Sequence, residues 1–196
     1  MLNTADLPGA FDSFERKTLD AIAEARKLTL PEASKAQFLT SKLTDAEVKR
    51  VREALPKPTQ KDIKAKSVGF LYVFAQRQGC SVDRLDIVSV IKHAKSGGAD
   101  KVEAMTNLCA INTDAPEGRV LYVGRSWDPR ARIAGHLRAS TGKTYAIHFA
   151  AWAQKLELQV EVYVYAFPGI ADRVLQVVED ATWDRFDPLF GRRGEK

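Results

Sequence analysis

The segment Leu156–Tyr165 alternates apolar with polar or amphipathic residues at a period of two. This alternation is typical of a strand with one buried face, because successive side chains of a strand point to opposite faces of a sheet. Pro168 and Gly169 follow the strand, and the next segment predicts a helix from about Ile170 to Phe186. The chain must therefore contain a sheet, and the sheet is accompanied by helices.

The strands ahead of this segment are predicted to be short. Residues 108–112 and 119–124 bracket the turn-rich connector 114–118, which predicts a β-hairpin. Helices are predicted from Pro129 through Leu137 and over 144–156. The order of two strands, two helices, a strand and a helix cannot wind as parallel βαβ units throughout. We therefore expect an α+β fold, with a small three-stranded antiparallel or mixed sheet flanked by helices.

The first half of the chain is predicted to be mainly helical. Thr44 and Glu47 have the spacing of a capping box at the start of a helix. Helices are expected over 11–28, 44–55 and 81–94, and a strand over 67–76. The pattern ends at Ser96-Gly97-Gly98, which predicts a boundary near residue 100. A helical region, 1–100, would then precede a second domain, 101–196.

The composition is that of a folded globular protein, with 45% hydrophobic and 28% charged residues. The longest wholly apolar run is far below the ~20 residues that span a bilayer. Asp6, Asp12 and Glu15 stand where a secretory signal would carry basic residues, so a cytoplasmic location is expected. Cys80 and Cys109 are expected to act as small hydrophobic residues outside any disulfide.

Positive charge is concentrated in one part of the chain. The formal net charge is +5, and residues 119–143 alone carry six basic side chains against Asp128. Such a patch favours an anionic partner. Its basic members are Arg119, Arg125, Arg130, Arg132, Arg138 and Lys143.

Arg132 and His136 lie four residues apart on the helix predicted after Pro129, so they share one helix face. The two side chains can converge on one ligand. A guanidinium matches phosphate oxygens with a planar fork of donors and stabilises the charge of a pentacoordinate phosphate. A solvated surface position is the alternative for Arg132.

Glu179 has an apolar setting on the last predicted helix. Its neighbours on the helix wheel are Leu175, Thr182, Trp183 and Phe186. An ionised carboxylate that is partly removed from water requires a partner. A cation such as Mg²⁺ and an internal salt bridge with an arginine are the two alternatives.

The run Val120–Ser126, followed by Arg132 and His136, closely resembles the second half of the GIY-YIG nuclease signature. Tyr122-Val123-Gly124 stands at the "YIG" position, and ten residues separate Tyr122 from Cys109-Ala110-Ile111, the interval at which the family carries its "GIY" strand. Glu179 and the run Asp187–Gly191 are similar to the family's metal-binding glutamate helix and its tail. The resemblance covers about residues 106–193.

The resemblance implies a divalent-metal-dependent endonuclease that hydrolyses phosphodiester bonds in DNA on a three-stranded antiparallel sheet. It implies that Glu179 holds Mg²⁺ or Mn²⁺ and that Arg132 contacts the scissile phosphate. Tyr122 would lie beside the attacking water, and His136 would assist proton transfer or hold the phosphate. Arg125, Arg130, Arg138 and Lys143 would contact nucleic acid, with double-stranded DNA as the expected partner.

One tyrosine of the family's signature is missing at the expected place, because Cys109-Ala110-Ile111 replaces the glycine-apolar-tyrosine triplet. Tyr145, after Lys143, is a hypothetical source of the second hydroxyl, and a packed aromatic residue is the alternative. The alternative function is a catalytically decayed nucleic-acid-binding module of the same fold. A third function is docking of the basic patch on an acidic protein, and the N-terminal region would select substrate or a protein partner.

Overall fold

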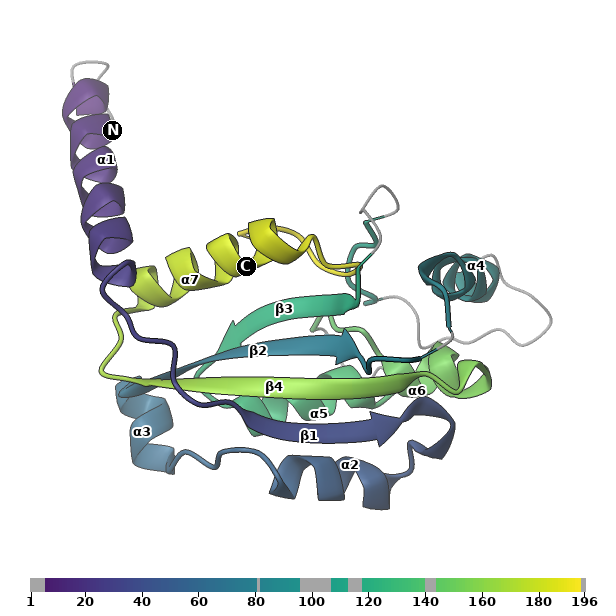
Figure 1. Ribbon diagram of the computed structural model, residues 1–196. Helices are drawn as coiled ribbons and strands as arrows, with labels where there is room; N and C mark the ends of the chain where they lie inside the picture. The colour runs from purple at the N-terminus through teal and green to yellow at the C-terminus, as the bar shows by residue number, and fades with distance from the viewer. Residues whose placement is uncertain (1–5, 81, 96–106, 113–117, 140–143, 195–196) are drawn as a thin grey trace.

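The computed structural model describes residues 6–80, 82–95, 107–112, 118–139 and 144–194. The elements in chain order are α1 (Asp6–Ala25), β1 (Ser34–Leu39), η1 (Thr40–Lys42), α2 (Asp45–Glu53), α3 (Gln60–Ala65), β2 (Val68–Gln76), α4 (Arg84–Lys95), β3 (Val120–Ser126), α5 (Pro129–Leu137), α6 (Phe149–Trp152), η3 (Ala153–Leu156), β4 (Gln159–Pro168) and α7 (Asp172–Phe186) (Figure 1).

The sheet has four antiparallel strands in the order β1-β4-β2-β3. The α+β class predicted from the sequence is confirmed, but the expected number of three strands is wrong. Two strands from the first half of the chain join the sheet: β2, which was predicted as a strand but not as part of this sheet, and β1, a short segment with a lysine and a glutamine that was not predicted as a strand. The sequence of β1 has only a weak strand pattern, and the segment is a strand because it pairs with β4 along its whole length.

The predicted hairpin between residues 108–112 and 119–124 is wrong. β3 pairs with β2, so that Tyr72 lies opposite Gly124 and Phe74 opposite Tyr122. The segment 107–112 makes isolated bridges instead, from Leu108 to Ala146 and from Ile111 to Phe190. The pairing partner of a strand depends on the path of the whole chain, and a turn-rich connector alone does not determine it.

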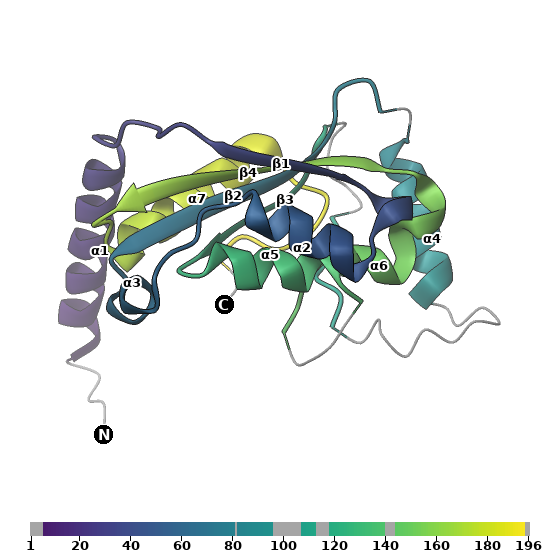
Figure 2. The ribbon, with the colours of Figure 1, turned by 90° about the horizontal axis from the view of Figure 1, so that it is seen from below.

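Helices cover both faces of the sheet. α7 and the C-terminal end of α1 lie on one face, and α2, α5 and α6 lie on the other (Figures 1 and 2). The side chains of β2 alternate between two buried clusters: Phe70, Tyr72 and Phe74 join the cluster under α5 and α6, while Leu71 and Val73 join the one under α7. A strand that is buried on both faces has a continuous apolar run, which explains why this segment showed no polar alternation.

Strands from both sides of residue 100 form this one sheet. β1 and β2 precede the predicted boundary, and β3 and β4 follow it. The larger core cluster also takes residues from both regions, such as Val51 and Phe74 from the first and Leu121 and Phe149 from the second. The N-terminal region, 1–100, is thus integrated with the region expected to carry the chemistry.

Local signals define several helix ends well. Asp128 caps α5 by accepting a hydrogen bond from the Ala131 amide, and Pro129 occupies the first turn, as the sequence predicts. Thr44 caps α2 by accepting a hydrogen bond from the Glu47 amide. The reciprocal capping box occurs at Thr59 and Asp62 instead, at the start of α3, a short helix that the sequence did not predict.

The helix predicted over 144–156 is much shorter in the structure. α6 and η3 together cover only Phe149–Leu156, and His148 precedes them with a φ of 55°. This left-handed backbone conformation cannot continue a right-handed helix toward Thr144. Over the ranges that the structure describes, none of the helices has the length and apolar character needed to cross a membrane.

Candidate active site between the β2–β3 strand pair, α5 and α7

Two tyrosines from adjacent strands form the centre of the candidate site. The rings of Tyr72 on β2 and Tyr122 on β3 are stacked, with centroids 6.0 Å apart and planes inclined by 18°. Gly124 lies next to both rings, and a Cβ atom at this position would be 2.5 Å from the Tyr72 hydroxyl and 2.6 Å from Cε1 of Tyr122. Glycine is therefore required at position 124 for the two rings to occupy these positions.

Arg132 from α5 acts on both tyrosines. Burial raises the pKa of Tyr72 and of Tyr122 and is the largest influence on each. The half-buried Arg132 guanidinium opposes this effect on both hydroxyl groups, through its positive charge and through hydrogen bonding. Two hydroxyl groups and a guanidinium thus share one small region between the sheet and α5.

His136, one turn after Arg132 on α5, is fully buried beneath Tyr72. Its Nδ1 accepts a hydrogen bond from the Ile147 amide at 3.1 Å, so this nitrogen carries no proton. The proton of the neutral ring is then on Nε2, which lies 3.2 Å from the Tyr72 hydroxyl and can donate to its oxygen. Burial, the largest influence, and the nearby Arg132 hold the pKa of His136 well below its usual value. The two α5 residues therefore occupy different layers: Arg132 faces the hydroxyls, and His136 supports one of them.

Glu179 of α7 lies in an ion pair with Arg125 of β3, whose Nε is 3.1 Å from Oε2. The Glu179 side chain retains 19% of its accessible surface, and the amide of Gln176 donates to the same oxygen. Burial raises the pKa of Glu179 to about 7, and the charge of Arg125 only partly opposes this rise. The salt bridge that the sequence offered as one alternative is present, and it leaves the carboxylate incompletely stabilised.

Glu179 and Arg132 act on the same two hydroxyl groups, although they are far apart in the sequence. The negative charge of Glu179 raises the pKa of both Tyr72 and Tyr122, and the positive charge of Arg132 lowers both. Opposite charges from α5 and α7 are therefore both near enough to influence the tyrosine pair. Of the residues predicted for one site, Arg132, Tyr122 and Glu179 are thus near one another, while His136 is buried behind Tyr72, and Tyr145 is exposed.

A metal ion would depend mainly on Glu179. Across the described parts of the chain, no group of three or more histidine, cysteine, aspartate or glutamate side chains could hold a metal. Mg²⁺ is commonly bound by one or two carboxylates, with water and substrate phosphates as its other ligands. Glu179 is a partly exposed carboxylate whose charged form burial disfavours, which fits this mode of binding, but its Oε2 is already held by Arg125 and Gln176, so a metal ion would share the carboxylate with them.

Most of the predicted basic patch takes part in the fold. Arg125 pairs with Asp172 as well as Glu179, and Arg119 donates to the carbonyl oxygen of Gln76. Arg130 donates to carbonyl oxygens at the end of α2, and Arg138 is exposed, 3.9 Å from Asp45. Lys143 lies outside the described residues. The sequence gives the number of basic side chains but does not show which of them already pair with groups of the protein itself.

Tyr72, and not Tyr145, lies beside Tyr122. Tyr145, the hypothetical source of a second hydroxyl, is 62% exposed, so it is neither a packed aromatic residue nor a member of the stacked pair. Sequence reasoning missed Tyr72, although the segment 67–76 was predicted to be a strand. Cys80 and Cys109 form no disulfide with each other, as expected, and Cys109 is buried close to Tyr122, although its segment does not pair with β3.

A cleft of about 380 Å³ gives access to Arg132. It is lined by Ser126, Asp128, Ala131, Arg132, Gly135, Thr144, Ala146 and His148. We refer to it as the Arg132 cleft. Comparison with known proteins gives no match to this chain among family models, curated proteins or solved structures.

Proposed function

We propose that this protein is a divalent-metal-dependent endonuclease with a site of the GIY-YIG type, acting on double-stranded DNA. The observation that carries the proposal is the convergence of Tyr72, Tyr122 and Arg132, with Glu179 close enough to influence both hydroxyl groups. The missing tyrosine of the signature is then supplied by Tyr72 rather than by Tyr145. The proposed site draws its residues from β2, β3, α5 and α7.

In this proposal Arg132 binds the scissile phosphate. Its guanidinium is half-buried and lies on the Arg132 cleft, where a phosphodiester can enter from solvent. An arginine remains charged through the reaction and donates two hydrogen bonds to neighbouring phosphate oxygens. These bonds strengthen as negative charge develops on the phosphate, which lowers the barrier.

The tyrosines would position the attacking water. His136 donates to the oxygen of Tyr72, so the hydroxyl hydrogen of Tyr72 points away from the imidazole. Tyr72 is fully buried, so a water that it orients would have to enter the region between the sheet and α5. The raised pKa of both tyrosines keeps them protonated near neutral pH. They would therefore act as hydrogen-bonding groups that orient the nucleophile, and His136 would be a positioning residue.

Glu179 is the residue that would hold Mg²⁺ or Mn²⁺. The bound ion would offset charge on the phosphate and on the leaving oxygen. Because the pKa of Glu179 is about 7, its carboxyl group is largely protonated in acid and cannot then serve as a ligand. Metal-dependent cleavage should consequently rise as the pH increases through about 7.

A nucleic-acid-binding module without catalysis is the second candidate function. The ion pair between Arg125 and Glu179 favours it, since a glutamate that serves only to neutralise an arginine needs no metal. The two candidates differ in their dependence on Glu179. In the module, the carboxylate contributes to stability alone.

The experiment is incubation of supercoiled plasmid with the protein, with and without Mg²⁺. The Glu179→Gln and Arg132→Ala variants are assayed beside Arg193→Ala, which removes an exposed arginine paired with Asp184. The proposal expects Mg²⁺-dependent nicking that is abolished in Glu179→Gln and Arg132→Ala and retained in Arg193→Ala. DNA binding by all of the proteins without any nicking would establish the binding module instead.

A further inference from the structure

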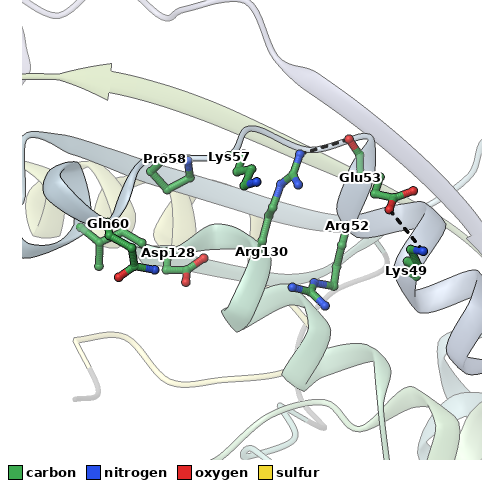
Figure 3. Close-up of a pocket in the computed structure, with 9 residues that line it drawn as sticks. Lys49, Arg52, Glu53, Lys57, Pro58, Gln60, Asp128 and Arg130 are labelled. Atoms are coloured by element: carbon green, nitrogen blue, oxygen red, sulfur yellow. Dashed lines mark hydrogen bonds and ion pairs between the residues drawn. The ribbon is translucent and has the colours of Figure 1, made fainter.

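A second cleft, of about 370 Å³, lies on the other side of α5, between α5, the end of α2 and α3 (Figure 3). We refer to it as the α2–α5 cleft. Its polar lining includes Lys49, Arg52, Lys57, Gln60, Asp128 and Arg130. The residues from α2 and from the segment before α3 belong to the N-terminal region, for which the sequence predicted a role in substrate selection.

The lining of this cleft has an excess of positive charge. Its four cations, from Lys49, Arg52, Lys57 and Arg130, face the carboxylates of Glu53 and Asp128. Both carboxylates already have partners: Glu53 lies 3.9 Å from Lys49, and Asp128 accepts the Ala131 amide as the cap of α5. The excess charge is therefore available to an anion from outside the chain.

Arg130 is held by backbone carbonyl oxygens, whereas Arg52 and Lys57 are the two of these cations whose side chains have neither an acidic partner nor a hydrogen bond among the described residues. Nε of Arg52 is shielded from solvent and makes no hydrogen bond there, and its guanidinium extends between α2 and α5 (Figure 3). Lys57 is exposed, and it forms no ion pair with the part of the chain that the structure describes. The shielded Nε cannot be reached from solvent, but the terminal nitrogens of the Arg52 guanidinium are not among the buried unpartnered atoms, so a phosphate oxygen in the cleft can accept hydrogen bonds from them.

Arg130 prevents α2 from presenting its negative end to the cleft. Its guanidinium donates to the carbonyl oxygens of Leu55 and Glu53, at 2.9 and 3.1 Å. The carbonyl groups at a helix C-terminus carry partial negative charge, which would otherwise repel an anion. Because Arg130 bonds to these carbonyl oxygens, their partial negative charge is offset. The cationic side chains of Arg52 and Lys57 can then act on an anion in the α2–α5 cleft.

The α2–α5 cleft and the Arg132 cleft are adjacent, because Asp128 lines both. They lie on opposite sides of α5, and a helix with its side chains is about 10–12 Å across. Because successive phosphates of one strand wind around the duplex axis, they are farther apart than the axial rise of about 3.4 Å, and this span corresponds to about two phosphate steps along one strand. One DNA backbone crossing α5 could therefore place phosphates in both clefts.

We infer that the α2–α5 cleft is a second phosphate-binding subsite for nucleic acid, in which Arg52 and Lys57 hold a backbone phosphate about two nucleotides from the phosphate at Arg132. The inference rests on the proposed function, because the path of the DNA backbone is defined by the phosphate proposed to bind at Arg132. It gives the N-terminal region a specific role, because the subsite fixes the duplex relative to α5 and requires substrate to extend beyond the cleaved bond.

The test measures binding of a labelled 20-base-pair duplex without metal ions, by fluorescence anisotropy between 50 and 200 mM salt. The variant Arg52→Gln/Lys57→Gln is compared with Lys92→Gln/Lys155→Gln, which removes two exposed lysines elsewhere and so has the same net charge. We expect the cleft variant to bind at least tenfold more weakly than this control at 100 mM salt. Its slope of log K against log salt should be smaller by about 2. The charge-conserving variant Arg52→Lys/Lys57→Arg should retain the wild-type slope.

Equal affinities and slopes for the cleft variant and the control variant would overturn the inference, as would a wild-type protein that does not bind duplex. Inorganic phosphate forms a separate arm: if phosphate raises the Tm of the wild type but not of the cleft variant while duplex binding is unchanged, the cleft takes small anions and not nucleic acid. The plasmid assay distinguishes the two proposals. If the cleft variant shows the smaller slope but the wild type does not nick plasmid, the subsite is supported and the nuclease is refuted. If the wild type nicks plasmid but the slopes of the cleft variant and the control are equal, the nuclease is supported and the subsite is refuted.

Discussion

A single hydrogen bond decides how Tyr72 can act. Because the Ile147 amide occupies Nδ1 of His136, Nε2 must be the donor toward the Tyr72 oxygen. The hydroxyl hydrogen of Tyr72 is thereby directed away from the imidazole. An exposed tyrosine such as Tyr145 is not held beneath the sheet in this way. At the residue scale, Tyr72 differs from Tyr145 because the Tyr72 hydroxyl oxygen is held by a hydrogen bond from His136.

Replacing Tyr72 by Phe should reduce plasmid nicking by about 10²-fold, the effect of losing one positioned hydrogen-bond donor in a transition state. Initial rates at saturating Mg²⁺ measure this loss. Tyr165→Phe is the matched control, because Tyr165 belongs to β4 and joins the cluster on the other face of the sheet. Tyr145→Phe should behave like the control; a greater loss in Tyr145→Phe than in Tyr72→Phe would assign the second hydroxyl to Tyr145.

The raised pKa of Glu179 makes the stability of the fold depend on pH. The folded protein holds a proton on Glu179 up to about pH 7, whereas the unfolded chain releases it near 4.5. Between these two values the folded state binds more protons, so the contribution of Glu179 to stability falls as the pH rises. The pH range of this effect, from about 4.5 to about 7, lies between the pKa of Glu179 in the unfolded chain and its raised pKa in the folded protein.

Urea unfolding of the wild type and Glu179→Gln at pH 5 and pH 8 tests this linkage. The Gln variant carries no titrating group at this position, and its stability relative to the wild type should increase by about 2 kcal/mol from pH 5 to pH 8. Addition of Mg²⁺ at pH 8 should stabilise only the wild type. A difference between the two proteins that does not change with pH would show that Glu179 titrates normally.

At the scale of elements, the β2–β3 pair determines the positions of the two stacked tyrosines. The antiparallel register sets Gly124 opposite Tyr72, and the missing side chain leaves room for the Tyr72 hydroxyl and the Tyr122 ring. The same glycine belongs to the Tyr122-Val123-Gly124 run that the sequence analysis singled out. Its role in the structure is steric.

Gly124→Ala should destabilise the protein by about 1–3 kcal/mol, the usual cost of overpacking a core, and should abolish nicking because both rings must move. Thermal unfolding gives the first quantity. Gly135→Ala provides the comparison within α5, where an added Cβ meets no atom within 4 Å. That variant should be more stable than the wild type by about 0.5–1 kcal/mol, since alanine is favoured over glycine inside a helix.

The sequence predicted those parts of the site that depend on neighbouring residues. Asp128 and Pro129 define the start of α5, so the shared helix of Arg132 and His136 could be predicted, and so could the helix that carries Glu179. The pairing of β2 with β3 could not, because 43 residues lie between Gln76 and Val120. Tyr72 was missed for this reason: its strand was visible in the sequence, but the neighbour of that strand was not.

At the scale of the whole molecule, the sheet does not divide at residue 100. β2 lies between β4 and β3, and it provides Phe70, Tyr72 and Phe74 to the larger core cluster. The region 101–196 without β2 would expose one edge of each neighbouring strand and the apolar residues that β2 covers. Unpaired backbone and uncovered apolar surface both oppose folding.

A protein that consists of residues 101–196 alone should therefore lack a cooperative unfolding transition and stable tertiary structure. Near-ultraviolet circular dichroism and thermal unfolding would show this. Mixing the fragment with residues 1–100 should restore part of the native signal, since β1 and β2 then become available. A cooperative transition in the isolated fragment would instead establish an independent C-terminal domain.

The interior place of β2 has a consequence for how the protein responds to heat. Hydrogen bonds of an inner strand exchange with solvent only through the largest openings of a structure. Tyr72 is carried by such a strand, so its backbone amide and those of its neighbours in β2 should be among the slowest of the molecule to exchange deuterium. The geometry of the candidate site should consequently survive fraying of the periphery, and any loss of the proposed activity on heating should coincide with global melting.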